Sequence, residues 1–364
     1  MAPRPLPNLA AIEPYKAGES KLPGFDKPIK LASNENPLGC SPAAREAYSV
    51  AAQSLHLYPD PGSTALRRAI ADRYGLDPDR IICGAGSDEI FQLLGRAFLA
   101  PGDEIVQSEY AFLVYRLVAQ QSGAIVRTAK DRDYVADVDA MLAAVTPKTR
   151  IVFLANPNNP TGTYLPIEAV RRLHAGLPGN VMLVLDAAYA EYVHRNDYAA
   201  GVELAAEYDN VVMTRTFSKI HGLAAARVGW AYAPVAVIDA LHKVRGPFNV
   251  AAPAQAAAAA AIADTDFATR SATENAAELD RVSAAIAALG LKVTPSVCNF
   301  VLAHFADACV AQAADAHLRA HGVIVRPLAA YGLPAALRFS IGLAAENDAM
   351  LAGLTGFMAQ RASA

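Results

Sequence analysis

The sequence predicts an α/β fold, in which a large domain with a mostly parallel central sheet is joined to a smaller α+β domain. Two observations predict it. Between about residues 43 and 263, short apolar runs alternate with helical patterns, as in open parallel sheets that carry helices on both faces. After about residue 265, a long polar helical pattern precedes several short strand-like runs. A chain of 364 residues is long enough for two such domains.

The N-terminal segment differs in composition from the rest of the chain. Its first 40 or so residues are rich in proline and glycine and end in LASNENPLG (31–39), so an extended arm is expected rather than a helix. We therefore predict three parts. Residues 1–42 form an N-terminal arm and part of the small domain, residues 43–263 form the large domain, and residues 264–364 form the C-terminal small domain.

Five strand-like runs are predicted for the large-domain sheet: RIICG (80–84), DEIVQSE (103–109), TRIVFLANP (149–157), VMLVLDAAY (181–189) and NVVMTRT (210–216). Amphipathic helices are predicted at EIFQLLGRAFL (89–99) and FLVYRLVAQQSG (112–123). The alanine-rich run at 250–263 is too short to span a bilayer and predicts a packed helix. The small-domain strand candidates are LKVTPS (291–296), NFVLAHF (299–305), VIVRP (323–327) and LRFSIG (337–342).

Charge and cysteine content exclude several classes of partner. The formal net charge of −3 gives no basic excess for binding nucleic acid or an anionic membrane. The N-terminus has no apolar segment of the signal-peptide type, and the four cysteines lie far apart, which together predict a cytoplasmic protein. His317 and His321 are four residues apart, but no glutamate accompanies them, so no metal site is predicted.

Polar groups follow several predicted strands at their carboxyl ends, where open parallel sheets bind ligands. These groups are GAGSDE after RIIC, Tyr110 after EIVQSE, NPNNPTG after IVFLA, Asp186 after VMLVL and the segment of Lys219 after VVMT. Because many strand ends carry such residues, the sequence predicts one site that is assembled from many segments.

Each of these groups also has an ordinary structural interpretation. The glycine-rich turn at 84–90 is either an anion cradle at a helix start or a simple turn with a serine cap. Asp186 either pairs with a protonated ring nitrogen or caps the next helix. Lys219 is either a covalent amine or a solvated loop cation. The occurrence of all these groups in one chain favours the functional interpretation over the structural one. Each group comes at the end of its own strand-like run, in the order Asn159, Asp186, Tyr189, Lys219 and Arg227.

At these positions the sequence resembles the fold-type I, class I and II aminotransferases, which use pyridoxal 5′-phosphate. In that family an asparagine in N-P-T-G, an aspartate with a tyrosine three residues later, and a lysine in S-K with an arginine eight residues later recur in this order. Within the family, the chain more specifically resembles the histidinol-phosphate aminotransferases. The motifs that carry this resemblance are LASNENPLG (31–39), LYPDPG (57–62), GSDEI (86–90), NPNNPTG (156–162), DAAYAEY (186–192), TFSKIHGLAAARVG (216–229) and VIVRPLAAYGLPAALRFSIG (323–342).

The resemblance implies a role for each cofactor residue. Lys219 would bind pyridoxal 5′-phosphate covalently and, when free, act as the base and acid that moves a proton. Asp186 would keep the pyridine nitrogen protonated, while Tyr189 and Asn159 would hydrogen bond the 3′ oxygen of the ring. Tyr110 would stack on the face of the cofactor ring, and Tyr58 would contact the phosphate of the cofactor in the other subunit. The phosphate of the chain's own cofactor would be bound by Gly86, Ser87, Thr216, Ser218 and Arg227. The contact of Tyr58 with the cofactor of the other subunit implies a homodimer with shared active sites.

The resemblance also implies substrate contacts. Arg338 would take the α-carboxylate of glutamate with a bidentate fork, which suits guanidinium better than ammonium. Together with Arg326 and Tyr15, it would accept the phosphate of histidinol phosphate. Asn36 would either line the pocket or only shape the turn in SNENP.

The implied reaction interconverts histidinol phosphate and 2-oxoglutarate with imidazole-acetol phosphate and glutamate, as in L-histidine biosynthesis. Two alternatives stay open. The first is the same chemistry on aromatic amino acids, because a hydrophobic pocket discriminates weakly between flat rings. The second is decarboxylation of a phosphorylated amino acid such as threonine phosphate. A non-catalytic sensor module is disfavoured because Lys219, Asp186 and Arg338 are all present.

Overall fold

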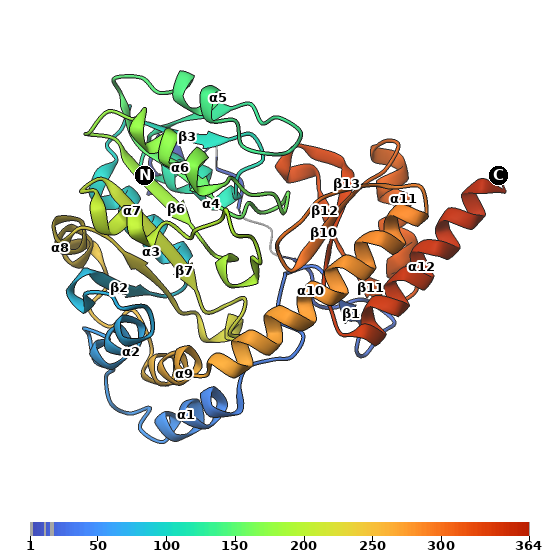
Figure 1. Ribbon diagram of the computed structural model, residues 1–364, viewed down its shortest axis with the longest axis horizontal. Coiled ribbons are helices and arrows are strands. Elements are labelled where there is room, and N and C mark those ends of the chain that lie inside the picture. Colours follow the sequence, from blue (N-terminus) through green and yellow to red (C-terminus); the bar gives the residue numbers. More distant parts are fainter. Residues whose placement is uncertain (1–2, 11, 15–17, 364) are drawn as a thin grey trace.

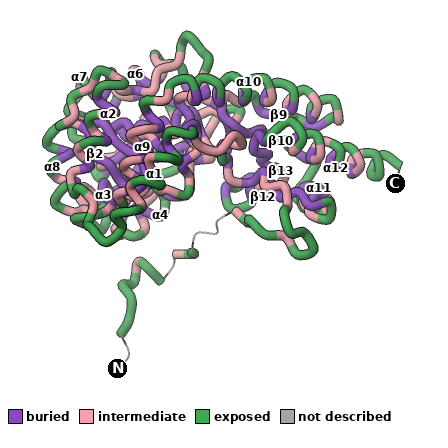
Figure 2. Tube along the Cα trace, turned by 90° about the horizontal axis from the view of Figure 1, so that it is seen from below, coloured by how far each residue is buried: buried purple, intermediate pink, exposed green. Residues whose placement is uncertain are grey.

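The structure is a computed structural model that describes residues 3–10, 12–14 and 18–363. Figure 1 shows a larger part that holds most of the helices and a smaller part that holds the C-terminus, with the long helix α10 (Thr265–Ala288) running between them. Figure 2 shows that buried residues concentrate inside both parts, whereas the first described residues are almost wholly exposed.

The larger part is built on a seven-stranded sheet with the order β2-β8-β7-β6-β5-β3-β4. Its strands are β2 (Ile81–Gly84), β3 (Glu104–Ser108), β4 (Ile125–Ala129), β5 (Thr149–Ala155), β6 (Met182–Asp186), β7 (Val211–Thr216) and β8 (Gly229–Tyr232). The strands from β7 to β4 are parallel, and only β8 runs antiparallel to both of its neighbours. The predicted mostly parallel sheet is therefore confirmed. Strands β4 and β8 were not predicted from the sequence.

Helices cover both faces of this sheet. They are α1 (Pro42–Ala52), α2 (Thr64–Tyr74), α3 (Ser87–Phe98), α4 (Leu113–Gln121), α5 (Val138–Ala143), α6 (Ile167–Ala175), α7 (Val202–Glu207), α8 (Val235–Val244) and α9 (Ala252–Ala263). Alternate residues of β6 belong to different core clusters, since Leu183 and Leu185 lie in one and Met182 and Val184 in the other. Burial on both faces explains why the predicted strands read as continuous apolar runs.

The alanine-rich segment forms a packed helix, as expected. Helix α9 packs against α1 and α2, where small side chains allow helices to approach closely. Helix α1 begins at a Ser41 cap, whose side chain accepts a hydrogen bond from the Ala44 N–H at 3.2 Å. None of the described helices combines the length and the apolar character needed to cross a bilayer.

The smaller part contains a four-stranded antiparallel sheet with the order β12-β13-β10-β9. Its elements are β9 (Lys292–Thr294), β10 (Phe300–His304), α11 (Ala308–Ala320), β11 (Val323–Ile324), β12 (Arg326–Leu328), β13 (Leu333–Ser340) and α12 (Ala344–Ala362). The arm joins this part, because β1 (Ile29–Lys30) pairs in parallel with β11. Short 3₁₀ helices complete the fold: η1 (Pro7–Leu9), η2 (Pro78–Arg80), η3 (Ala190–Tyr192), η4 (Ala224–Ala226) and η5 (Ala329–Tyr331).

The three largest hydrophobic cores separate along the chain in a way that supports the predicted domains, while two smaller clusters join the parts. Leu31 from the arm packs in one cluster with residues between 279 and 357, whereas the two clusters that flank the large sheet draw on residues between 44 and 262. We therefore propose that 1–42, 43–263 and 264–364 are the arm, the large domain and the small domain.

Candidate active site

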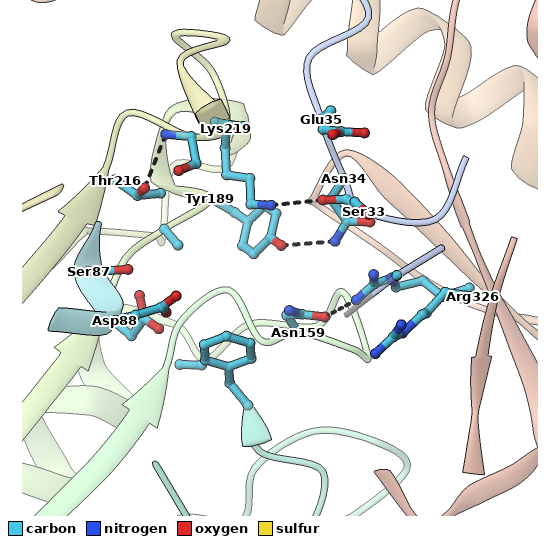
Figure 3. A pocket seen from close by; sticks show the side chains of 18 of the residues that line it. Ser33, Asn34, Glu35, Ser87, Asp88, Asn159, Tyr189, Thr216, Lys219 and Arg326 are labelled. Atoms are coloured by element: carbon cyan, nitrogen blue, oxygen red, sulfur yellow. Dashed lines mark hydrogen bonds between the residues drawn. The ribbon is translucent and has the colours of Figure 1, made fainter. Parts of the chain in front are cut away.

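A cavity of about 260 Å³ lies where the two parts and the arm meet. It is lined by the carboxyl ends of β5, β6 and β7, the start of α3, arm residues 32–35, and β12 and β13. Figure 3 shows side chains from all of these segments converging on one space. The sequence prediction of a site assembled from many segments agrees with this arrangement.

Lys219 lies three residues beyond the end of β7, in a tight turn. Phe217 and Ile220 are fully buried and anchor the turn on either side of the lysine. Gly222 closes it with a φ of 65°, and a Cβ at that position would lie 1.8 Å from the carbonyl oxygen of Gly39. Only glycine fits both requirements, so the turn is fixed against the arm.

The amine of Lys219 points into the cavity (Figure 3) and donates a hydrogen bond to the carbonyl oxygen of Ser33 at 3.0 Å. Burial, assisted by the nearby positive charge of Arg338, lowers the pKa of Lys219 to about 8. Near neutral pH a substantial fraction of the amine is therefore uncharged. An uncharged amine is the form that acts as a nucleophile and as a base.

Asp186 is the last residue of β6 and is only 5% exposed. Its Oδ2 accepts a hydrogen bond from the Tyr115 hydroxyl at 2.6 Å, while its Oδ1 is buried and receives no hydrogen bond from the described residues. Burial raises the pKa of Asp186 to about 6, although the bond from Tyr115 opposes the rise. Above that pH a cavity-lining residue carries a buried carboxylate with one acceptor oxygen that receives no hydrogen bond from the described residues, which suits an N–H donor.

Two glycines allow the start of α3 to approach its neighbours closely. Gly86 has a φ of 81°, and a Cβ there would lie 2.3 Å from a guanidinium nitrogen of Arg227. A Cβ on Gly229 would lie 2.3 Å from the backbone nitrogen of Ser87. The helix N-terminus, with its free N–H groups, is therefore held beside Arg227.

Arg227 completes a group of anion-binding donors. Its guanidinium donates to the Ser218 hydroxyl at 3.2 Å and lies 3.5 Å from the carboxylate of Asp88. The Thr216 hydroxyl, at the end of β7, accepts the Ser218 N–H at 3.1 Å and lines the same cavity. Hydroxyls, a guanidinium and a helix N-terminus together form the kind of site that binds phosphate.

The arm contributes directly to the cavity through Asn34. Its side-chain amide donates to the Tyr189 hydroxyl at 2.9 Å (Figure 3), and its side-chain oxygen accepts from the Ser340 hydroxyl at 2.8 Å. Asn159, from the loop after β5, accepts a hydrogen bond from Arg338. These contacts tie the arm, the large sheet and β13 together around the same space.

Two arginines lie side by side on neighbouring strands of the small sheet. Arg326 of β12 and Arg338 of β13 are directly paired in register, and both line the cavity. Arg338 is 5% exposed and donates to the Ala32 carbonyl oxygen at 2.9 Å. Like charges opposite each other on neighbouring strands repel, so an anion bound between them would be stabilised.

Most of the predicted cofactor and substrate residues therefore meet at this cavity. They are Ser87, Asn159, Asp186, Tyr189, Thr216, Ser218, Lys219, Arg227, Arg326 and Arg338, with Gly86 directly beside them. Their individual roles stay predictions. Tyr15 lies outside the described residues.

The aromatic residue at the cavity differs from the predicted one. Phe112 lines the cavity, whereas Tyr110 is absent from the described lining and packs against Tyr134, with ring centroids 5.6 Å apart. The reason is the start of α4 at Leu113, which makes Phe112 the cap residue next to the site. That Tyr110 faces the cofactor ring stays a prediction, and Phe112 is the ring that lines the cavity in this structure.

Asn36 also differs from the pocket-lining expectation. Its amide donates to the Ile220 carbonyl oxygen at 2.7 Å and to the Ser271 hydroxyl at 3.1 Å, so it shapes the arm behind the Lys219 turn. Tyr58 is 82% exposed, stacks on Phe248 with ring centroids 4.5 Å apart, and is not among the residues that line the cavity of its own chain.

Sequence reasoning missed several residues of the site. Tyr115 was part of an amphipathic helix pattern, and its three-residue spacing from Phe112 was the signal that one helical turn carries both rings to the same place. Ser33 had no signal, because its contribution is a main-chain carbonyl group. Asp88 was visible in the GSDE motif but was given no role.

Comparison with known proteins identifies the family. The family model described as "Aminotransferase class I and II" matches residues 26–354. The chain is 56% identical to a histidinol-phosphate aminotransferase of Maricaulis maris, over 98% of this chain and 99% of that protein. It is 53% identical to the histidinol-phosphate aminotransferase of Rhodospirillum centenum, over 95% of this chain and 96% of that protein.

A solved structure extends this likeness to the fold. The histidinol-phosphate aminotransferase of Sinorhizobium meliloti, crystallised in complex with pyridoxal-5′-phosphate, superposes with a TM-score of 0.90 at 29% identity and covers 100% of this chain and 99% of its own. An aspartate aminotransferase variant of Thermus thermophilus, at 24% identity and a TM-score of 0.80, shares the fold. The chain belongs to the class I and II aminotransferases and, among them, to the histidinol-phosphate aminotransferase family.

Proposed function

We propose that the protein is a pyridoxal 5′-phosphate-dependent aminotransferase that interconverts histidinol phosphate and 2-oxoglutarate with imidazole-acetol phosphate and glutamate, in L-histidine biosynthesis. The observation that carries the proposal is the opposed pair Arg326 and Arg338, which faces the same cavity as the amine of Lys219. One substrate brings a phosphate and the other a carboxylate, and both need cations at this place. The names and full-length identity of the relatives support the same reaction.

The residues of the cavity fit the cofactor. Asp186 Oδ1 is a buried acceptor without a hydrogen bond among the described residues, and it suits the protonated nitrogen of a pyridine ring. The start of α3, Ser218 and Arg227 would hold the cofactor phosphate, and the amine of Lys219 would bind the cofactor carbonyl carbon. When bound, pyridoxal 5′-phosphate supplies a carbonyl that receives the amino group and a ring that withdraws electrons from the substrate carbon.

The residues of this chain supply binding and proton transfer. Lys219 Nζ, when uncharged, takes the proton from the substrate carbon that bears the nitrogen, and it returns that proton on the cofactor side. The lowered pKa of Lys219, about 8, keeps enough of the amine in this form near neutral pH. Asp186 would hold the proton on the ring nitrogen, and the Tyr189 hydroxyl, which accepts a hydrogen bond from Asn34, would hold the ring oxygen.

The test of the substrate compares amino donors that differ in their ring and in their anionic group. Amino transfer is measured as glutamate formation from 2-oxoglutarate, with histidinol phosphate, phenylalanine or threonine phosphate as amino donor, and carbon dioxide release is followed in parallel. We expect kcat/KM for histidinol phosphate to exceed that for phenylalanine by at least about 100-fold, because the phosphate makes charge-assisted bonds that phenylalanine lacks.

The variant Arg326→Gln sharpens this test. We expect it to lower the histidinol phosphate half-reaction about 10- to 100-fold and to leave the glutamate half-reaction less affected, because Arg338 remains. A preference for phenylalanine would make the protein an aromatic aminotransferase, and stoichiometric carbon dioxide release would make it a decarboxylase.

We further propose a homodimer with shared active sites. Exposed apolar side chains on α1, on the segment that follows it and at Phe248 support this proposal, since large apolar groups left uncovered together mark interaction surfaces. They are Tyr48, Val50, Leu55, Leu57, Tyr58 and Phe248. Tyr58 stacks on Phe248 and is available to a second copy.

Mixed dimers test the shared site. Lys219→Ala chains and Tyr58→Ala chains are co-expressed with different tags, and dimers that carry both tags are purified. We expect these dimers to be more active than either parent dimer, because one of their two sites combines an intact Lys219 with an intact Tyr58. No gain in activity would show that each site is built from a single chain.

A cytoplasmic location is also proposed. All four cysteines are free, and Cys83 and Cys298 are buried, which suits a reducing compartment. Fractionation of cells that express the tagged full-length chain tests this location, and recovery from the periplasm or membrane fraction would contradict it.

A further inference from the structure

Tyr115 contacts the buried carboxylate of the active site without lining the cavity itself. It lies on α4, is fully buried, and its hydroxyl donates to Asp186 Oδ2 at 2.6 Å. Burial and the adjacent carboxylate raise the pKa of Tyr115 well above its ordinary value, so it stays protonated and remains a donor. The bond is a charge-assisted hydrogen bond, which is short and strong.

Aromatic neighbours on three elements fix the position of this hydroxyl. The Tyr115 ring stacks on Phe153 of β5, with centroids 4.6 Å apart and planes 6° from parallel. Phe91 of α3 meets it edge-on at 5.2 Å, and Phe112 meets it edge-on at 5.8 Å. A ring packed in this way has little rotational freedom, so the position of the hydroxyl oxygen is set by the fold.

The consequence for Asp186 is that its two oxygens are distinct. Tyr115 occupies Oδ2, and Oδ1 is the buried acceptor that receives no hydrogen bond from the described residues. Described groups act on the charge of this carboxylate in both directions. Tyr115 on α4 and, less strongly, the Ala188 N–H and the Thr214 hydroxyl stabilise the ionised form, whereas Asp88 on α3 opposes it by like-charge repulsion.

We propose that Tyr115 is a positioning residue that holds Asp186 by Oδ2, so that Oδ1 meets the ring N–H of the cofactor and the proton stays on the ring nitrogen. Without the tyrosine hydroxyl, the buried carboxylate loses the hydrogen bond that orients it and stabilises its negative charge. It then competes with the ring nitrogen for the proton. The proposal rests on the cofactor assignment within the proposed function and is independent of which amino donor the enzyme uses.

The test measures cofactor binding in the absence of any amino substrate. Pyridoxal 5′-phosphate is titrated at pH 8 into cofactor-free full-length wild type, Tyr115→Phe, Asp186→Asn and the double variant. We expect Tyr115→Phe to weaken binding about 10-fold in the wild-type background and less than about 2-fold in the Asp186→Asn background, because the effect passes through the carboxylate.

A second readout separates positioning from packing. With a cofactor labelled with ¹⁵N in its ring, we expect the wild-type signal at the position of a protonated nitrogen and the Tyr115→Phe signal displaced toward the unprotonated position. Tyr198→Phe is the matched control, since it removes a hydroxyl that donates to the Asn156 carbonyl oxygen at 2.9 Å and makes no bond to Asp186. The control is expected to keep the wild-type ¹⁵N signal.

Two results would overturn the proposal. One is an equal loss of affinity from Tyr115→Phe in both backgrounds, which would show that the hydroxyl acts by another route. The other is a wild-type ¹⁵N signal in Tyr115→Phe. Failure of the substrate assignment would leave both readouts unchanged, because neither uses an amino donor.

Discussion

The two sides of the active-site cavity are built differently. On the cofactor side, strand ends of the large sheet and the start of α3 place Lys219, Asp186 and Arg227, and close-fitting glycines fix the backbone. On the substrate side, the arm and the small sheet place Arg326 and Arg338, and hydrogen bonds between distant segments hold them. We therefore propose that the large sheet carries the chemistry, whereas substrate recognition depends on how the other segments meet it.

The largest expected effect comes from the centre of the cofactor side. Lys219→Ala removes both the covalent amine and the proton carrier, so we expect transamination to fall by more than about 10⁴-fold and the absorbance of covalently bound cofactor to vanish. Lys292→Ala, which removes a lysine of the small sheet, is the control and should behave as wild type. Retained activity in Lys219→Ala would break the mechanism.

The next effect tests the substrate side. Arg338→Ala should slow the glutamate and the histidinol phosphate half-reactions together, by about 10²- to 10³-fold, and should change cofactor affinity much less, because its charge-assisted bonds go to the substrate. The matched control is Arg361→Ala, since Arg361 lies over Phe357 much as Arg338 lies over Phe300. Unchanged rates for both substrates would remove Arg338 from the site.

A smaller effect tests the rigidity of the phosphate site. Gly86→Ala adds a Cβ 2.3 Å from the Arg227 guanidinium at a φ of 81°, so Arg227 must move, and we expect cofactor affinity to fall about 10-fold. Gly75→Ala is the matched control, because Gly75 has a φ of 67° but nothing within 4 Å of its Cβ position. Equal losses of affinity in the two variants would attribute the effect to backbone strain alone.

The smallest effect concerns pH and links the two sides. The pKa of Lys219 is lowered to about 8, first by burial and then by Arg338, so about one tenth of the amine is uncharged at pH 7 and about half at pH 8. The rate of cofactor capture by the cofactor-free enzyme should therefore rise with pH through about 8. Arg338→Gln should move that midpoint upward, because a positive charge that disfavours protonation is lost. A midpoint that does not move would show that the two sides are not coupled by charge.

The cofactor side could largely be predicted from sequence because position follows from topology there. Asp186 ends β6, Lys219 lies three residues beyond the end of β7, and parallel strands bring their carboxyl ends to one edge. Gly86 and Arg227 were predicted from the motifs of the family resemblance. The strand β8 was missed because GWAY is short and follows a glycine- and alanine-rich stretch.

The rest of the site could not be predicted because it depends on contacts between segments. Which aromatic residue faces the cavity depends on the residue at which α4 begins, and Phe112 rather than Tyr110 is its cap. Ser33 contributes a carbonyl oxygen that every residue has, so no residue type marks it. Whether Asn36 lines the pocket or supports the turn was decided by Ile220 and Ser271, which are far away in sequence.

The most direct test of the account is a single-turnover half-reaction on the purified enzyme loaded with pyridoxal 5′-phosphate. Loss of the absorbance of the bound cofactor is followed with histidinol phosphate and, separately, with phenylalanine. We predict rapid conversion by histidinol phosphate and conversion at least about 100-fold slower by phenylalanine at equal concentration, since only the former brings a phosphate to Arg326 and Arg338. A faster response to phenylalanine would contradict it.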